Sequence, residues 1–152
     1  MITLIENVSL PSIEMGKILR NTAIETLKYE KHAQDVDLSI VIDDDKHMNE
    51  LNKRFRDIDS TTDVLSFQAN EIDPDSKILY IGDIIISLEQ AARQAEKLNH
   101  PIIDELQLLT VHGTLHLLGH DHSEVDEKNK MWDSQKSILT SLGVNIAEWP
   151  EG

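Results

Sequence analysis

The sequence contains no cysteine and no long hydrophobic run. Without cysteine the chain has no disulfide framework, no cysteine-ligated zinc site and no thiol catalysis, and it suits a reducing cytosol. The longest apolar runs, such as Ile84–Ile86, are far shorter than the roughly 18 residues that a membrane-spanning helix needs. The N-terminus also lacks the basic start and apolar stretch of a signal peptide. We therefore expect a cytoplasmic protein with no membrane partner.

Positive charge and aromatic side chains are also scarce. The 152 residues include 14 Lys and Arg against 28 Asp and Glu, so the formal net charge is −14 and the sequence pI is about 4.7. Nucleic-acid binding through overall charge is therefore disfavoured, and DNA is not an expected partner, although a local cationic patch can act within an acidic surface. The chain has only 2 Trp, 2 Tyr and 2 Phe. Base stacking thus has little support, and Trp132 and Trp149 are predicted to be packing residues.

No repeat, low-complexity tract or Pro/Gly/Ser-rich linker divides the chain, so residues 1–152 are predicted to form a single domain. Apolar periodicity predicts the order β, α, β, α, β, β, α, α, α. The fold class is α/β (α+β), with a small, mostly four-stranded sheet packed with about five helices, and the pattern leaves the topology open. The predicted strands cover residues 2–8, 36–42, 64–67 and 78–87, and the helices cover about 12–31, 46–56, 87–98, 104–118 and 124–142. The second helix is expected to carry Met48, Leu51 and Phe55 on one apolar face.

Four of the seven histidines lie near the end of the predicted long central helix. His112 and His116 are one turn apart on one helical face, so both imidazoles can point at one ion. Gly119 permits the left-handed turn that commonly ends a helix, and His122 can then fold back toward the other two. The pattern H-x-x-x-H-x-x-G-x-x-H has the ligand spacing of the metzincin proteases, but Gly113 stands where those enzymes carry the Glu general base. The spacing predicts a metal site that lacks the peptidase base.

Three neutral imidazoles leave a coordination position open on a divalent ion, as in catalytic zinc sites. Zinc held this way lowers the pKa of a bound water to about 7 and polarises a phosphoryl or carbonyl oxygen, so hydrolysis is the expected chemistry. We predict one Zn²⁺ per chain, although other divalent transition metals suit the same ligands. His120 is an alternative third ligand, but the spacing selects His122. His32, His47 and His100 are scattered and are expected to be surface or structural residues.

A cationic helix end is a second candidate feature. From Lys46 to Arg56 there are four cationic residues against Glu50, a local charge of +3 in an acidic chain. Arg56 has two possible roles. It can present planar donors to phosphate oxygens, or it can stabilise the helix C-terminus and pair with Asp59. Position alone favours the second role.

Three segments together resemble the signatures of the YbeY family of bacterial endoribonucleases. They are Asn52–Phe67, Gly82–Ser87 and His112–His122, and they occur in the family's order. Two positions depart from the family pattern. Gln68 stands where a proline is usual, and His120 stands where a tyrosine is usual.

The resemblance implies a zinc-dependent enzyme that cleaves single-stranded RNA and acts in 16S rRNA maturation and ribosome quality control. It implies that His112, His116 and His122 are the zinc ligands and that Arg56 is the family's motif arginine. The predicted catalytic residues are therefore Arg56, His112 and His116, with a metal-bound water or hydroxide cleaving the phosphodiester while Arg56 steadies the phosphate. The expected partners are single-stranded RNA, including rRNA, and the ribosome or its proteins.

Two other functions stay open at this point. A net charge of −14 suits a ribosome-associated interaction module that binds basic ribosomal proteins and uses its metal only to stabilise the fold. The metzincin-like spacing suits a metallopeptidase-like hydrolase, and Gly113 argues against that activity.

Overall fold

The computed structural model describes residues 1–31, 36–146 and 148–151, so His32 lies outside the described residues. In the described part, four strands and five helices follow one another in the predicted order, and the α+β fold class is confirmed. None of these helices is long and apolar enough to cross a membrane. The strands are β1 (Ile2–Glu6), β2 (Val36–Asp43), β3 (Val64–Ile72) and β4 (Leu79–Ser87), and the helices are α1 (Ile13–Tyr29), α2 (Asp45–Arg56), α3 (Leu88–Leu98), α4 (Ile102–Leu117) and α5 (Val125–Ser141).

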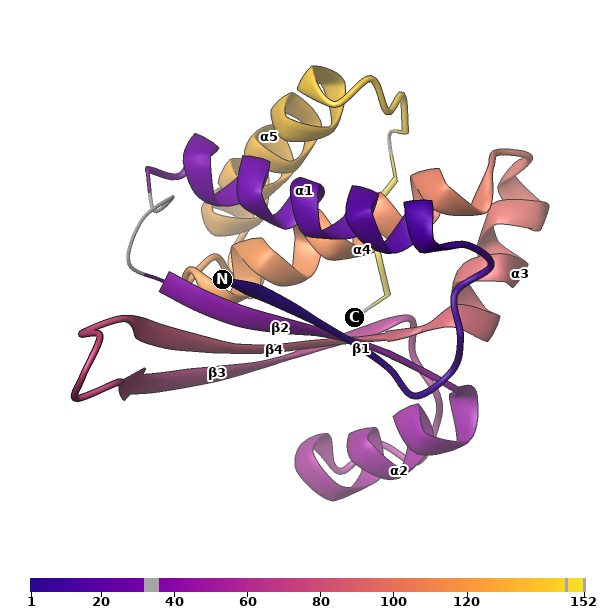
Figure 1. Ribbon diagram of the computed structural model, residues 1–152. Helices are drawn as coiled ribbons and strands as arrows, with labels where there is room; N and C mark the ends of the chain where they lie inside the picture. The colour runs from indigo at the N-terminus through magenta and orange to yellow at the C-terminus, as the bar shows by residue number, and fades with distance from the viewer. Residues whose placement is uncertain (32–35, 147, 152) are drawn as a thin grey trace.

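The four strands form one mixed sheet in the order β1-β2-β4-β3. β1, β2 and β4 are parallel, with Ile40 beside Ile84, and β3 runs antiparallel to β4. In Figure 1, α1, α4 and α5 lie above one face of the sheet and α2 lies below the other. Because successive side chains of a strand point to opposite faces, Ile84 and Ile86 join the core with α1 and α4, whereas Ile85 packs with Met48 of α2. Coverage of both faces explains why β4 is apolar at consecutive positions.

Helix α4 lies between the sheet and α5 and is buried along nearly its whole length. Gly113 allows a close approach of α4 to the sheet, because a Cβ there would lie 2.5 Å from Cγ2 of Ile84. Ser66 of β3 adds a hydrogen bond of 3.1 Å from its Oγ to the carbonyl oxygen of Gly113. The helix end that carries the predicted metal ligands is therefore held firmly on the sheet.

The structure differs from the sequence-based expectations at four places. β1 ends at Glu6 and not at Val8, because the N–H groups of Asn7 and Val8 both donate to the carbonyl oxygen of Ile42 and the regular pairing stops. β3 continues past Phe67 to Ile72, because its second half also pairs with β4. α4 begins at Ile102, directly after Pro101, since a proline at a helix start loses no hydrogen bond that the helix would use. Phe55 was expected on the apolar face of α2, and its side chain is 56% exposed.

Candidate metal centre

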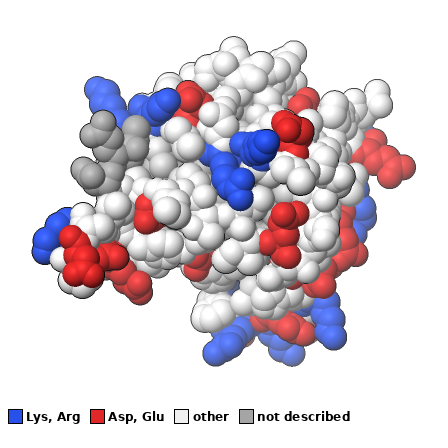
Figure 2. All heavy atoms as spheres, in the orientation of Figure 1, with Lys and Arg blue, Asp and Glu red and all other residues white. Residues whose placement is uncertain are grey.

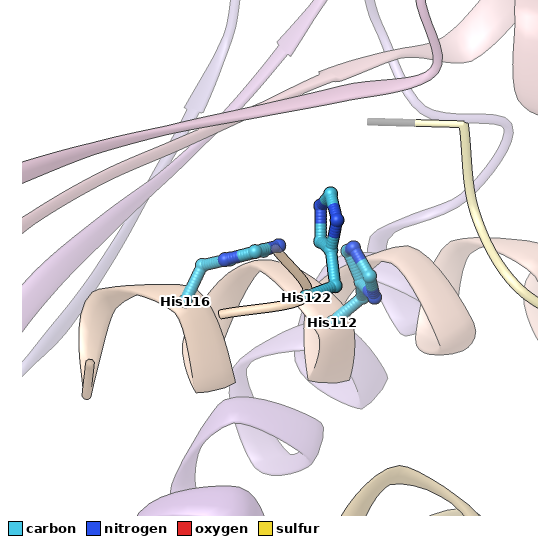
Figure 3. Close-up of side chains that lie close together, drawn as sticks. All are labelled: His112, His116 and His122. Atoms are coloured by element: carbon cyan, nitrogen blue, oxygen red, sulfur yellow. The ribbon is translucent and has the colours of Figure 1, made fainter. Parts of the chain in front are cut away.

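The end of α4 brings the three predicted metal ligands together. One potential ligand atom from each of His112, His116 and His122 lies within 4.8 Å of the others. The ring centroids of His112 and His116 are 4.7 Å apart, and those of His116 and His122 are 5.2 Å apart. Figure 3 shows the three imidazoles converging from α4 and from the segment that follows it. Helical spacing and the turn after the helix thus produce a three-histidine cluster.

The turn after α4 brings the chain back toward the helix. Gly119 has a φ of +98°, a conformation that glycine adopts without the steric cost of a Cβ. The N–H of Gly119 donates to the carbonyl oxygen of His116, and the N–H of His120 donates to that of Leu115, both at 3.0 Å. These two bonds form a Schellman motif, which satisfies carbonyl groups that a helix end leaves unpaired. The motif directs the chain so that His122 lies beside His116.

Hydrogen bonds orient two of the ligand rings. Nδ1 of His112, which is fully buried, lies 2.9 Å from Oε1 of Gln135 on α5. Nδ1 of His116 lies 3.0 Å from the carbonyl oxygen of His120. An imidazole that donates to such an acceptor has a defined ring orientation and tautomer, as in many metal sites. His122 is the exposed member of the three.

The surroundings of His116 favour its neutral form. Burial, followed by the positive charge that the neighbouring His112 and His122 rings can carry, lowers the pKa of His116 to about 4. A neutral imidazole has the lone pair that metal ligation requires. Three nitrogen donors at this separation, two of them oriented by hydrogen bonds, match the ligands that zinc and similar divalent ions prefer. The residues present therefore fit the predicted ion.

Arg56 lies across a cleft from this cluster. The cleft has a volume of about 340 Å³, and its walls come from the end of α2, from β3 and from the turn after α4. The Nη2 of Arg56 donates to the carbonyl oxygen of Ser66 at 3.3 Å, while Lys53 is the cation that lies 4.0 Å from Asp59. The lining residues are Arg56, Val64, Ser66, Gln68, His116, Gly119, His120, Asp121 and His122.

Known proteins are similar to this chain in sequence. A sequence model of the family described as Endoribonuclease YbeY matches residues 3–143. The chain is 36% identical over 140 residues to Endoribonuclease YbeY of Caldicellulosiruptor bescii. This alignment covers 86% of this chain and 88% of that protein. It is 45% identical over 107 residues to the protein of the same name from Carboxydothermus hydrogenoformans, covering 70% and 73% of the two chains. The chain belongs to the YbeY family.

A solved structure has the same fold. The solution structure of a Thermotoga maritima protein matches with a TM-score of 0.59 and 23% identity, covering 99% of this chain and 97% of that one. At this identity the likeness concerns the fold alone.

Gln68, at a position where the motif resemblance leads us to expect proline, connects the sheet to α4. Its Nε2 donates to the carbonyl oxygen of His116 at 3.1 Å. Ser66, two residues earlier on the same strand, bonds to Gly113. A proline has no such side-chain donor, so this member of the family has a contact beside a ligand histidine that the usual residue cannot make.

His120, at a position where the motif resemblance leads us to expect tyrosine, does not join the three-histidine cluster. Its Nε2 pairs with the carboxylate of Glu30 just after α1, while its carbonyl oxygen orients His116. Asp121 stabilises the turn, because its Oδ1 accepts a hydrogen bond of 2.7 Å from the N–H of His122. The ligand set that the geometry gathers contains His122 rather than His120.

The position of Gly113 also bears on the peptidase hypothesis. A Cβ at this position would meet Ile84 Cγ2 at 2.5 Å and Ser66 Oγ at 3.2 Å. A glutamate placed here would therefore point into the packed contact between α4 and the sheet. Packing as well as chemistry thus argues against a metzincin-like base at this position.

Two residues of the centre were not anticipated from the sequence. Gln135 of α5 contacts His112, and the indole of Trp149 packs against His112 and His122, with centroid distances of 4.9 and 5.6 Å. Gln135 has no local sequence signal. Trp149 has one weak signal, since it is one of only two tryptophans in an aromatic-poor chain.

Proposed function

We propose that this protein is a metal-dependent endoribonuclease that cleaves single-stranded RNA. The observation that carries the proposal is the shared cleft, in which Arg56 lies opposite His116 and His122. A cation and a set of metal ligands on facing walls suit a phosphodiester, because its phosphoryl oxygens carry the negative charge. Membership of the YbeY family supports RNA as the substrate.

His112, His116 and His122 would hold the ion, with zinc as the expected metal. Bound zinc would supply a Lewis acid that polarises a phosphoryl oxygen and activates water near neutral pH. The chain's own part is to keep His116 neutral and to orient the imidazoles of His112 and His116 beside the cleft. The contacts from Gln135 and from the His120 carbonyl oxygen perform this role for two of the three rings.

Arg56 would steady the phosphate during cleavage. Its guanidinium carries five N–H donors in a planar fork, which matches two phosphate oxygens better than an ammonium group does. The bond from Nη2 to Ser66 limits the motion of the side chain, and the remaining donors stay available to a substrate in the cleft. Restraint of this kind favours a donor that is already in place as charge develops in the transition state.

Helix α2 would give the RNA a cationic approach to the cleft. Lys53 and Arg54 are exposed beside Arg56, and Figure 2 shows Lys and Arg side chains, interspersed with acidic ones, at the α2 end of the molecule. A flexible single strand can bring one phosphate into a small cleft, whereas the phosphates of a duplex lie on a rigid A-form helix. Because the whole chain is acidic, we expect this binding to be local and sensitive to salt.

We further propose that the enzyme acts in 16S rRNA maturation and ribosome quality control in the cytoplasm. This follows from the resemblance of its motifs to YbeY signatures. The net charge of −14 favours contact with basic ribosomal proteins, which would add affinity for the ribosome. The same charge supports a second candidate, an interaction module in which the metal only stabilises the fold.

Cleavage of a labelled single-stranded RNA tests the proposal. Zinc-loaded wild-type protein is compared with His116→Ala and with a control variant, His47→Ala. His47 lies outside the cleft and pairs with Asp43. Metal content and circular dichroism are recorded for every preparation. Wild type and His47→Ala should cleave the RNA, whereas His116→Ala should stay folded and lose cleavage together with metal.

Other outcomes would contradict the proposal. Cleavage that persists in His116→Ala would identify a contaminating nuclease. An absence of cleavage by fully metal-loaded wild type, both alone and with ribosomes, would favour the interaction module. So would a His116→Ala protein that unfolds in proportion to metal loss and loses ribosome binding only to that extent.

A further inference from the structure

The C-terminal tail, described over residues 144–146 and 148–151, returns across the molecule to the metal centre. The family match stops just before this segment, and in Figure 1 the tail runs from the end of α5 toward the sheet. The N–H of Glu151 donates to Oδ2 of the buried Asp63 at 2.9 Å. Oε1 of Glu148 lies 3.1 Å from Nε2 of His100. These contacts fix the tail on both sides of Pro150 and the residue that precedes it.

That residue, Trp149, packs against the ligand histidines. Its ring centroid is 4.9 Å from that of His112 and 5.6 Å from that of His122, with interplanar angles of 88° and 87°. This edge-to-face arrangement is favourable for aromatic rings. Trp132 of α5 stacks on the indole at 5.7 Å, and Nζ of Lys128 lies 5.3 Å from the ring centroid. The indole is therefore held in place from α5 as well as by its own neighbours.

His122 depends on this contact more than the other two ligands do. The rings of His112 and His116 each have a hydrogen-bond partner. Among the described residues, no hydrogen bond reaches the ring of His122, whose one bond is made by its backbone N–H. Its ring contacts are those with His112, His116 and Trp149. Since His122 follows α4 rather than lying on it, the indole is the group outside the ligand set that limits the freedom of this ring.

A second connection joins the tail to the same centre. Oε1 of Gln135 lies 2.9 Å from Nδ1 of His112, and its Nε2 donates to the carbonyl oxygen of Glu148 at 3.2 Å. The amide that orients one ligand thus also holds the residue that precedes Trp149. Displacement of the tail would disturb two of the three ligands together.

We propose that Trp149 is a positioning residue of the metal centre, which fixes the ring of His122 and closes the side of the centre that faces the tail. This inference rests on the proposed metal site. Trp149 lies after residue 143, where the match to the family model ends. Loss of the indole is expected to weaken metal binding by about 10-fold or more, the range found for residues that orient metal ligands.

Zinc affinity measured by competition with a chromophoric chelator tests the proposal on the full chain. Trp149→Ala should bind zinc at least about 10-fold more weakly than wild type, and Trp149→Phe should recover most of the affinity because it keeps an aromatic ring. Phe55→Ala is the control, because it removes an aromatic ring that is 56% exposed on α2, outside both the histidine cluster and the tail, and it should leave zinc affinity unchanged. His116→Ala reports on the metal site itself. Thermal unfolding in the presence of EDTA measures the effect of each change on folding without metal.

Tryptophan fluorescence provides a readout that does not depend on the Ala variant folding. The chain has two tryptophans, so Trp132→Phe leaves Trp149 as the only emitter and Trp149→Phe leaves Trp132. Addition of zinc should change the emission of Trp132→Phe strongly and that of Trp149→Phe weakly. Unchanged emission from Trp132→Phe at zinc saturation would overturn the proposal.

The two hypotheses fail in different ways. If His116→Ala loses zinc while Trp149→Ala binds it as tightly as wild type, the role of Trp149 is overturned and the proposed metal site stands. If His116→Ala binds zinc as tightly as wild type, the metal site is wrong and the role of Trp149 falls with it.

Discussion

Gly113 stands where a metzincin-like glutamate base would be, and it also lets α4 pack closely on the sheet. Its lack of a side chain lets α4 approach the sheet, since a Cβ would lie 2.5 Å from Ile84 Cγ2. We expect Gly113→Ala to lower the free energy of unfolding by about 1 to 3 kcal/mol, as overpacking of a core typically does. Urea-induced unfolding followed by circular dichroism would measure this loss.

The partner of Gly113 supplies the control for this prediction. Ile84→Ala removes the methyl group that the new Cβ would meet, at the cost of a cavity. In the double variant, the free energy of unfolding should fall by less than the sum of the two single losses, because the overpacking is relieved. Additive losses would show that the Gly113–Ile84 contact does not limit packing here.

Arg56 is expected to affect cleavage without affecting metal binding. It lines the cleft and lies on α2, whereas the ligands belong to α4 and the turn after it. Arg56→Ala should lower the single-turnover cleavage rate by about 10²- to 10³-fold, as loss of a transition-state donor does. Arg56→Lys should recover only part of the rate, because an ammonium group lacks the planar fork.

Arg20→Ala is a matched control for the arginine variants. Arg20 is exposed on α1 and should be replaceable without a change in rate. Zinc content should be equal in wild type, Arg56→Ala and Arg20→Ala. A rate for Arg56→Ala equal to that of wild type at saturating RNA would remove Arg56 from the mechanism.

At the scale of elements, the end of α4 combines helix termination with ligand placement. Gly119 adopts a φ of +98°, and among the described residues no heavy atom other than those of its chain neighbours lies within 4 Å of where its Cβ would be. Replacement therefore acts through backbone conformation and not through a clash. Gly119→Val should lower the free energy of unfolding by about 1 to 3 kcal/mol, since a β-branched residue is strained at positive φ. It should also weaken zinc binding, because the same turn positions the His120 carbonyl oxygen.

Gly119→Asn distinguishes the effect of the positive φ from the effect of adding a side chain. Asparagine tolerates positive φ better than other non-glycine residues, so this variant should retain more stability and more zinc affinity than Gly119→Val. Thermal unfolding and chelator competition measure the two effects on the same samples. Equal losses in both variants would mean that the turn conformation is not what matters.

At the scale of the whole molecule, a buried carboxyl joins α4 to the tail. Burial, together with Glu148 close by, raises the pKa of Glu105 to about 8. Gln94 of α3 donates to Glu105, His100 lies 3.1 Å away, and Asp63 adds a like charge. Because the folded state holds this proton more tightly than the unfolded state, it contributes stability fully below the unfolded pKa of 4.5, and the contribution is lost as pH rises through about 8.

Stability should therefore fall as pH rises between these two values. One linked proton changes the free energy of unfolding by at most about 1.4 kcal/mol per pH unit. Glu105→Gln keeps the shape and removes the titration, so the difference in free energy of unfolding between the two proteins should vary with pH over this window. Denaturant titrations at several pH values would measure it. Parallel pH profiles for the two proteins would contradict the raised pKa.

RNA binding should weaken as salt concentration rises, with a slope set by the few cationic side chains that α2 presents beside the cleft. Each phosphate contact to single-stranded RNA contributes about 0.7 to the slope of log K against log salt concentration. Lys53→Ala and Arg54→Ala should each reduce that slope by about this amount and leave zinc binding unchanged. Filter binding over a salt series tests this. A slope unaltered by both changes would place the RNA elsewhere on the surface.

Local patterns in the sequence were sufficient for the order of elements and for the three-histidine cluster. Periods of 2 and 3.6 residues mark strands and helices, and the His112, His116 and Gly119 spacing depends on a single helix and its end. Predictions at element ends were less reliable. The extension of β3 to Ile72 comes from pairing with β4, and the exposure of Phe55 depends on where α2 meets the sheet.

The sequence by itself therefore determined the element types, the acidic character and the ligand spacing, because each depends on composition or on residues within a few positions of one another. Tertiary structure decided the strand order, the meeting of Arg56 with the histidines across one cleft, and the packing of Trp149 on two of the ligands. These contacts join residues that are far apart along the chain. They exist only when the sheet and its covering helices pack into one core, and no local periodicity encodes that packing.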